Sequence, residues 1–389
     1  MAGAEEMPEW TKLPIDLQHG FFQLAESEAK SLMDILDRIN SVLRVLWIEI
    51  SPYLRAFPEQ VKRSIIAAVD SSRSPRLSER LGVRYGVYAT GIVYLKGSER
   101  LHEKFKPGAF RCGQALSRDN SKILFELETL LAERRIALEA LNECDIIFID
   151  GSFYGFVYQA LDLLRKSRRL EERERNVINE IFDITERLRE SRRVLGIVKR
   201  SRSRALGGFM FKKYGAKEFV NLLDKHMLSL IMPEKSFFEY KDILGEMPTS
   251  VYTRIAYLVS IGLSGEDLEK ATERGVYEPF EKLGLQKEGF NSMRRAQVRF
   301  SGEAPPCEIE YPSGIDIRDV LSEEGLFNEG TNLPVALDLV DSLVNISSKF
   351  TEEFVSEIEG RILENMVRDG GSLKSIKAFF TFINPQKPF

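Results

Sequence analysis

The sequence predicts a mixed α/β fold in which helices cover a sheet. Two apolar runs, residues 64–69 and 146–149, each lead directly into an aspartate, which is typical of buried strands that end at a polar crevice. The segment 121–143 has the helical spacing of apolar residues and predicts a long amphipathic helix between these strands. Strands, a helix and then another strand is the order of elements expected of a mixed sheet with helices packed on it.

The composition is that of a globular chain. The 389 residues are 43% apolar and 29% charged, and the formal net charge is -4. This length favours about two to three domains, or one large α/β domain with additions. The balanced charge excludes a strongly cationic protein, although a local basic groove remains compatible with it.

We expect a cytoplasmic protein with no membrane partner. The N-terminal stretch lacks the pattern of a signal peptide, and no apolar run approaches the ~18 residues of a membrane helix. Three widely spaced cysteines (Cys112, Cys144 and Cys307) indicate reduced thiols and no disulfide framework.

The remaining elements are expected in this order. A helical extension covers residues 1–60, a strand of period two covers 83–95, and a short strand follows near 108–116. A strand ends at Lys199, a helix covers 219–232, two short strands follow at 298–302 and 307–312, and a closing helix covers 333–347.

The segment 165–193 is dominated by charges of both signs and is interpreted as a charged helical insertion. One interpretation is a solvated helix or helical pair, whose apolar stripe packs on the core. The other is one wall of a nucleic-acid channel or a partner surface, because blocks of charge also serve binding.

The acids that follow the two strands are the candidate site. Asp70 and Asp150, joined by a glutamate of the intervening helix (Glu126, Glu128, Glu133 or Glu139), would form an oxygen-only site. Mg²⁺ and Mn²⁺ prefer oxygen ligands and bring substrate phosphates with them. The alternative is that an aspartate in this position is only a turn residue.

The ordered motifs resemble those of the NurA nucleases of archaea and some bacteria. "AAVDSSR" resembles their first motif, and "AERRIALEALNECDIIFIDGSF" resembles the second block, in a register that selects Glu133. "GIVKRSRS" is similar to the following strand with its lysine, and "LLDKHMLSLIMPEKSF" to a segment that places Asp224 at an acidic position. "PPCEIEYP" and "NLPVALDLVDSL" resemble the last strand and helix, so the resemblance covers residues 60 to 345.

This resemblance implies a ribonuclease-H-like nuclease domain over residues 61–350, preceded by the helical extension and followed by a C-terminal helix and aromatic tail over 351–389. It implies Mn²⁺-dependent (or Mg²⁺-dependent) cleavage of single- and double-stranded DNA, with 5′-3′ exonuclease and endonuclease activity. It also implies a homodimer that acts with a hexameric HerA-type helicase-translocase ATPase in end resection of double-strand breaks, a step of repair by homologous recombination.

Carried over residue by residue, the resemblance makes Asp70, Glu133 and Asp150 the metal ligands. Lys199 would contact the phosphate or the transition state, and the alternative for it is an ordinary lysine at a strand end. The basic run that follows (Arg200, Arg202 and Arg204), together with Arg73, would contact DNA phosphates, or simply form a solvated loop.

Two residues depart from the family pattern. Ser71 replaces a glycine, so we expect the loop after Asp70 to differ. The last helix carries Asp341 where the family has a histidine; Asp341 is either a fourth ligand or a surface residue of a non-catalytic helix. These departures motivate an alternative function, that of a catalytically impaired adaptor or DNA-binding partner of the translocase. The aromatic tail is expected to dock on a partner or to fold back on its own core.

Overall fold

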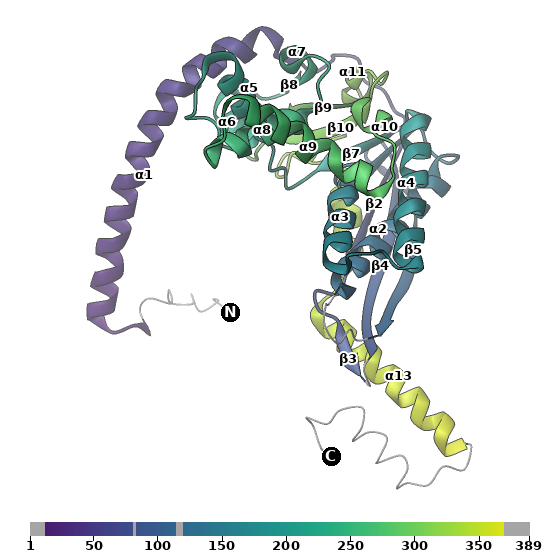
Figure 1. The fold of residues 1–389 in the computed structure, drawn as a ribbon. Helices are drawn as coiled ribbons and strands as arrows, with labels where there is room; N and C mark the ends of the chain where they lie inside the picture. Colours follow the sequence, from purple (N-terminus) through teal and green to yellow (C-terminus); the bar gives the residue numbers. More distant parts are fainter. Residues whose placement is uncertain (1–11, 81–82, 114–119, 369–389) are drawn as a thin grey trace, which may run out of the picture.

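The computed structural model describes residues 12–80, 83–113 and 120–368 (Figure 1). In these ranges ten strands form one mixed sheet in the order β1-β8-β9-β10-β7-β6-β2-β4-β3, with β5 paired to β4. The strands are β1 (Arg55–Ala56), β2 (Ile65–Arg73), β3 (Ser78–Arg80), β4 (Val83–Lys96), β5 (Glu99–Gly113), β6 (Ile146–Asp150), β7 (Val194–Val198), β8 (Ser236–Glu239), β9 (Met293–Arg299) and β10 (Cys307–Pro312).

The helices fall into three groups. The sheet is flanked by α2 (Ser121–Ala140), α3 (Phe156–Ser167), α4 (Glu172–Ser191), α11 (Ile317–Leu321) and α12 (Val335–Leu343). A helical cluster contains α5 (Ala205–Tyr214), α6 (Asp224–Ile231), α7 (Lys241–Leu244), α8 (Thr249–Ser260), α9 (Gly265–Leu283) and α10 (Glu288–Asn291). Two helices project from the body, α1 (Ile15–Ile50) and α13 (Ser348–Arg368), and a short 3₁₀ turn, η2 (Ser51–Tyr53), follows α1.

The centre of the sheet has the ribonuclease-H-like arrangement. The strands β5, β4 and β2 are antiparallel neighbours, whereas β2, β6 and β7 run parallel. Numbered along the chain, these five strands lie in the order 3-2-1-4-5. The predicted fold class, a mixed sheet of this type flanked by helices, is therefore confirmed.

Strand alternation divides the core into two layers. Along β2, Ala67 and Val69 pack into the layer that contains α2, α3 and α4, whereas Ile66 and Ala68 pack into the layer that contains α11 and α12. We call these the α2 face and the α12 face. Both faces of the central strands are covered, which explains why their sequences are continuous apolar runs.

The charged segment forms the last residues of α3 and the whole of α4, and these two helices connect the parallel strands β6 and β7. Its apolar stripe (Val177, Ile178, Ile181, Ile184 and Leu188) is buried, and its arginines and glutamates pair with α2 through Arg173–Glu128 and Arg135–Glu180. Because a parallel connection needs such a crossover, the apolar side of α4 belongs to the core of the domain. Its charged side faces solvent, as in a solvated helix.

Strand β5 is longer than the strand expected near 108–116. It pairs with β4 from Glu99 to Gly113, and almost all of its side chains are exposed. The strand forms through backbone pairing at the outer side of the sheet, so its sequence lacks the apolar alternation by which strands are predicted.

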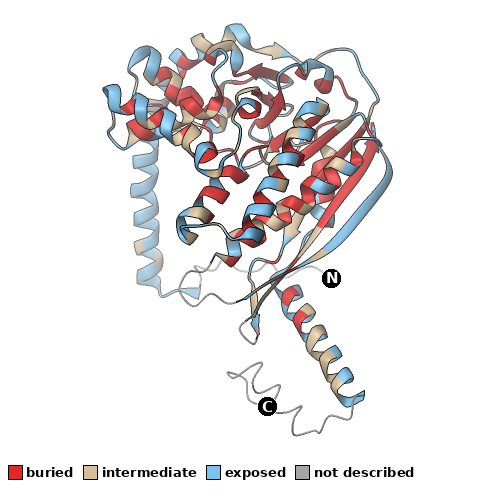
Figure 2. Cartoon of the chain, turned by 45° about the vertical axis from the view of Figure 1, so that its right-hand side comes forward, coloured by how far each residue is buried: buried red, intermediate tan, exposed pale blue. Residues whose placement is uncertain are grey.

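The first half of α1 is hardly covered by the rest of the described chain. Residues 15–33 of α1 are almost entirely exposed, including Phe21, Phe22 and Leu24 (Figure 2). The aromatic tail beyond Arg368 lies outside the described residues. None of the described helices combines the length and the hydropathy that a membrane-spanning segment requires.

Candidate metal centre

Strand alternation places Asp70, Asp150 and Lys199 on the same side of the sheet. Asp70 follows Ala68 in the period of two, Asp150 follows Phe148, and Lys199 continues the alternation of β7 just beyond its end. All three therefore extend toward the α12 face. The strands β2, β6 and β7 are parallel neighbours, so these positions meet at one edge, where ligands bind in sheets of this kind.

Strand β2 does not end at Asp70, as the sequence suggested. It continues to Arg73 in antiparallel pairing with β4, whereas its parallel pairing with β6 stops at Val69. Asp70 thus lies where the crevice opens on the β6 side. No loop begins directly after Asp70, because Ser71 is part of the strand and has no positive φ.

Lys199 lies at the centre of the acidic residues. Its ammonium nitrogen is 2.8 Å from Oδ2 of Asp70, 3.4 Å from Oδ1 of Asp341 and 3.7 Å from Oδ2 of Asp150. Only 17% of the Lys199 side chain is exposed, so it is not an ordinary surface lysine.

Glu133 reaches the site from the opposite layer. It lies on α2, and Ser71, whose side chain points to the α2 face, donates a hydrogen bond of 2.7 Å to its Oε2. The Ser71 backbone N–H donates to Oδ1 of Asp70 at 2.7 Å. Ser71 therefore links two of the predicted ligands. Oε1 of Glu133 is buried and has no hydrogen-bond partner among the described residues.

Two glycines shape the turn that follows Asp150. Gly151 has φ of 79°, a left-handed conformation that favours glycine, and its N–H donates to the Ile197 carbonyl at 2.8 Å. A Cβ atom on Gly196 of β7 would lie 2.5 Å from the Gly151 carbonyl oxygen. Glycine at both positions lets the turn pack directly against β7 and fixes the direction of Asp150.

Arg134 is a residue of the site that the sequence did not indicate. It is fully buried beside Glu133, with Nη1 3.8 Å from Oε1 of Glu133, and its Nη2 donates to the Ser152 carbonyl at 3.2 Å. Arg134 thereby ties α2 to the turn after Asp150. In the sequence it is one of two adjacent arginines in a charged helix, so no local signal distinguishes it.

Too little positive charge surrounds these buried acids to keep their pKa values in the usual range for carboxyl groups. Burial and the neighbouring charge of Asp150 raise the pKa of Asp70 to about 8. Burial raises the pKa of Glu133 to about 7, and burial likewise raises that of Asp150. Burial lowers the pKa of Lys199, but the charges of Asp150 and Asp70 outweigh this effect and raise it, so the ammonium stays protonated.

These residues fit a divalent cation in their chemistry and position. The donors are carboxylate oxygens, and a cationic ammonium already lies among those of Asp70 and Asp150. Oε1 of Glu133 is buried and accepts no hydrogen bond from the described residues. Within the described ranges, no three His, Cys, Asp or Glu side chains are arranged so that they could hold an ion as they stand. The Lys199 ammonium occupies the centre of the acid cluster instead.

Asp341 joins this cluster from α12, which packs on β2 and β4. Its side chain is 64% exposed although it lies 3.4 Å from Lys199. Asp341 is therefore a surface residue of α12 whose carboxylate lies within reach of the site.

The predicted DNA contacts are only partly gathered at the site. Arg73 is paired with Glu126, its Nη2 lying 2.8 Å from Oε1. Arg200 and Arg202 are exposed in the loop after β7, and Arg204 is half-buried where α5 begins.

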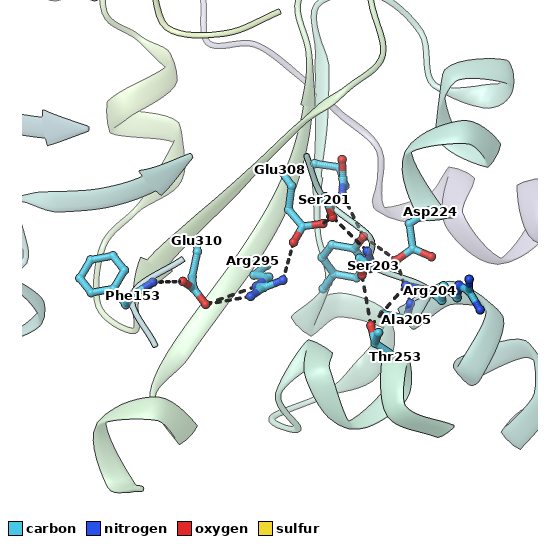
Figure 3. A network of polar contacts seen from close by, with 12 residues as sticks. Phe153, Ser201, Ser203, Arg204, Ala205, Asp224, Thr253, Arg295, Glu308 and Glu310 are labelled. Atoms are coloured by element: carbon cyan, nitrogen blue, oxygen red, sulfur yellow. Dashed lines mark hydrogen bonds and ion pairs between the residues drawn. The ribbon is translucent and has the colours of Figure 1, made fainter. Parts of the chain in front are cut away.

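A second network of buried polar residues lies on the α2 face of β9 and β10 (Figure 3). Arg295 bonds Glu308 at 2.5 Å and Glu310 at 3.1 Å, and Glu310 accepts a hydrogen bond from the Phe153 backbone N–H at 2.7 Å. Glu308 accepts from Ser201 at 2.7 Å. The network therefore joins the turn after Asp150 to the loop after Lys199.

Asp224 anchors the helical cluster within the same region. It is completely buried and accepts hydrogen bonds from the Ser203 hydroxyl and from the backbone N–H groups of Ala205 and Leu206. Burial raises its pKa to about 7. Its contacts cap the start of α5, so the structure gives Asp224 a supporting position outside the acid cluster.

Comparison with protein families finds one match. A family model described as the NurA domain matches residues 64–266, just over half of the chain. No curated protein matches the chain.

Several solved structures are similar in fold. The NurA nuclease from Sulfolobus solfataricus is 16% identical, with a TM-score of 0.49 over 87% of this chain and 98% of that one. A structure of NurA bound to dAMP and manganese is 13% identical, with a TM-score of 0.47 over 83% and 93% of the two chains. A structure of NurA with manganese is 13% identical, with a TM-score of 0.45 over 83% and 94%.

Proposed function

Because the chain belongs to the NurA family, we propose that it is a metal-dependent deoxyribonuclease that hydrolyses phosphodiester bonds of single- and double-stranded DNA. The observation that carries the proposal is the convergence of Asp70 and Asp150 on Lys199 at one edge of the parallel strands, where Ser71 links Asp70 to Glu133. These acids are far apart in the sequence, so only the fold explains their proximity.

In this proposal Asp70, Glu133 and Asp150 hold Mn²⁺ or Mg²⁺, and Asp341 is a fourth, more exposed ligand. The bound cation would supply Lewis-acid stabilisation of the phosphate and lower the pKa of the attacking water. Lys199 stays protonated and donates to a non-bridging phosphate oxygen. Ser71 and Arg134 hold Glu133 and the turn after Asp150 in place.

The partner expected from the family is a hexameric HerA-type ATPase, in end resection of double-strand breaks, with 5′-3′ exonuclease and endonuclease activity. The sequence contains no GxxxxGK[ST] phosphate-binding loop, so a partner would have to supply ATP-driven movement along DNA. Exposed apolar side chains on α1 (Leu17, Phe21 and Leu24), spaced along one side of the helix, would serve contact with a second copy or with the ATPase.

We also propose a homodimer and a cytoplasmic location. The three widely spaced cysteines show no disulfide framework in the sequence, which fits a reducing compartment. Light scattering of the purified protein would measure the mass in solution and test the dimer directly.

A second candidate is a catalytically impaired adaptor of the translocase. It is favoured by one observation: the Lys199 ammonium, rather than open space, lies between the carboxylates. A permanent internal cation would satisfy the acids without a metal.

Degradation of labelled single- and double-stranded DNA with Mn²⁺ distinguishes the two. The nuclease proposal predicts that the protein degrades both DNAs, that Asp70→Ala and Asp150→Ala abolish this activity, and that Asp183→Ala, at an exposed position on α4, leaves it intact. Activity that survives both site substitutions contradicts the assigned site. No activity in any divalent metal, with or without the ATPase, supports the adaptor.

A further inference from the structure

A pocket of about 700 Å³ opens next to the metal centre. It lies between the loop after β7, α3, α8 and α9, and Val198 forms part of its wall. Val198 directly precedes Lys199, so the pocket and the acid cluster lie on opposite sides of the same strand end. We call it the arginine pocket and define it by Tyr158, Arg202, Arg204, Ser250, Arg254 and Arg295.

The arginine pocket is strongly cationic although the chain as a whole has a net charge of -4. No aspartate or glutamate is among the described residues that line it. Arg295 is neutralised by Glu308 and Glu310. Arg202, Arg204 and Arg254 form no ion pair with any residue that the structure describes. Three unpaired guanidinium groups around one cavity repel one another, and a bound anion would remove that repulsion.

Two buried polar atoms in the wall have no partner. The Ser250 hydroxyl and Nε of Arg254 are buried and form no hydrogen bond to the described part of the protein. Buried donors are almost always satisfied, and those that are not indicate a missing ligand or solvent molecule. Both atoms belong to α8.

The position of Arg254 is built into the fold. Its guanidinium lies 5.1 Å from the centre of the Tyr257 ring. It also packs on Gly275 of α9, where a Cβ atom would come within 2.3 Å of Nε. Any larger residue at position 275 would displace the guanidinium, so the α8–α9 contact depends on this pair.

The arginine pocket is close to the acid cluster along the chain and is rigidly tied to it. Lys199 and Arg204 are separated by five Cα steps of about 3.8 Å, which limits their Cα distance to roughly 19 Å. The network of Figure 3 starts at Phe153, three residues after Asp150, and reaches Ser201 in the pocket wall through Glu310, Arg295 and Glu308. A DNA strand held at the metal centre would need only a few nucleotides to reach the arginine pocket.

We propose that the arginine pocket binds a nucleotide unit of the DNA strand whose scissile bond lies at the acid cluster. Arg204 and Arg254 contact its phosphate, and Tyr158 and Tyr257, which are 40% and 45% exposed, offer aromatic faces for its base. This inference rests on the proposed nuclease function. Binding in the arginine pocket gives the DNA strand a second contact, which fixes its register over the metal centre.

Binding without catalysis tests the proposal. Single-stranded DNA labelled at its 3′ end is titrated by fluorescence anisotropy, in EDTA, with the wild-type protein, Arg204→Gln/Arg254→Gln and Arg202→Glu. Arg187→Gln, which removes an exposed charge on α4, is the matched control. We expect the double variant to bind roughly tenfold or more weakly. The slope of log K against log salt should become shallower by about 0.7 for each phosphate that the variant no longer neutralises.

The outcomes separate the pocket from the proposed function. One outcome is that wild-type protein cleaves DNA while the folded pocket variants bind it as tightly as Arg187→Gln does. This outcome overturns the proposal that the arginine pocket binds DNA. Wild-type protein that binds DNA through the arginines but cleaves nothing in Mn²⁺ overturns the nuclease function and retains the pocket as a DNA site. Arg202 lies in an exposed loop, so we expect Arg202→Glu to fold. If this variant binds DNA as tightly as the wild-type protein, the proposal is overturned even where the double variant fails to fold.

Unlabelled competitors identify the source of the phosphate. Unlabelled single-stranded DNA should displace the probe at a far lower concentration than dAMP or inorganic phosphate does. Equal displacement by dAMP that disappears in the double variant would show a site for free nucleotides and overturn the assignment to the DNA strand.

Discussion

The Lys199 ammonium lies 2.8 Å from Oδ2 of Asp70, a residue 129 positions away in the sequence. It is the one cation that the described structure places within 4 Å of Asp70, Asp150 and Asp341 together. The lysine therefore compensates part of the negative charge at the position where a metal ion would do the same. Its role in stability and its role toward a phosphate can be separated by experiment.

Replacing Lys199 with methionine should destabilise the metal-free protein. Removing one partner of a buried ion pair leaves uncompensated charge and costs roughly 3–5 kcal/mol. Mn²⁺ should restore most of this free energy of unfolding, because the cation replaces the ammonium. Denaturant unfolding with and without Mn²⁺ measures both effects. Lys199→Arg, which keeps the charge, is the control, and a destabilisation that Mn²⁺ leaves unchanged would contradict this role.

Asp70→Asn should lower DNA cleavage by at least about a thousandfold, because it removes a ligand that acts on the reacting phosphate. Above about pH 8, where Asp70 is ionised, it should also raise the melting temperature of the metal-free protein, since it removes a buried carboxylate that is repelled by Asp150. Asp183→Asn on α4 should change neither property. A variant that loses activity together with its melting transition would instead indicate a structural role for Asp70.

The affinity for Mn²⁺ should rise between pH 6 and pH 8. The pKa of Asp70 is raised to about 8 and that of Glu133 to about 7, so near neutral pH the metal-free native state holds protons that the unfolded chain has released. The free energy of unfolding of the metal-free protein should therefore fall as pH rises from about 4 to 8. Calorimetric titration in two buffers should detect proton release on binding, and an affinity independent of pH would argue against these acids as ligands.

Asp341→Ala distinguishes the two interpretations of that residue. As an exposed fourth ligand, its removal should raise the Mn²⁺ concentration for half-maximal cleavage by about tenfold and leave the activity at saturating metal largely intact. An unchanged metal requirement would make Asp341 a surface residue of α12.

Arg295→Met should lower the free energy of unfolding by about 3–5 kcal/mol, because Glu308 and Glu310 would remain buried without a cation. Arg187→Met, at an exposed position, should cost less than about 0.5 kcal/mol. Denaturant titration of both variants provides the comparison. Equal stability would mean that water or another group satisfies the two glutamates.

The central strands and the acid positions could be predicted because they follow local rules. The apolar runs before Asp70 and Asp150 alternate between two covered faces, and the parallel order of β2, β6 and β7 brings their ends together. Glu133 could be selected among its helical neighbours only by resemblance to a family.

The parts that escaped prediction depend on tertiary contacts. The helix α9 contains Gly275 and Pro279, which weaken a helical pattern, and it forms because its apolar side packs on α8 and α3. Arg134 and Arg295 are charged residues that are normally exposed, and only the three-dimensional pairing with acids explains their burial. The sequence around each carries no sign of this.

The most direct test of the central claim is a crystal of the protein soaked in Mn²⁺ and measured at the manganese absorption edge. We expect an anomalous peak about 2.0–2.3 Å from carboxylate oxygens of Asp70, Glu133 and Asp150, with the Lys199 ammonium displaced from its place beside Asp70 and Asp150. Manganese bound elsewhere, in protein that still cleaves DNA while Lys199 keeps its place among the acids, would contradict it.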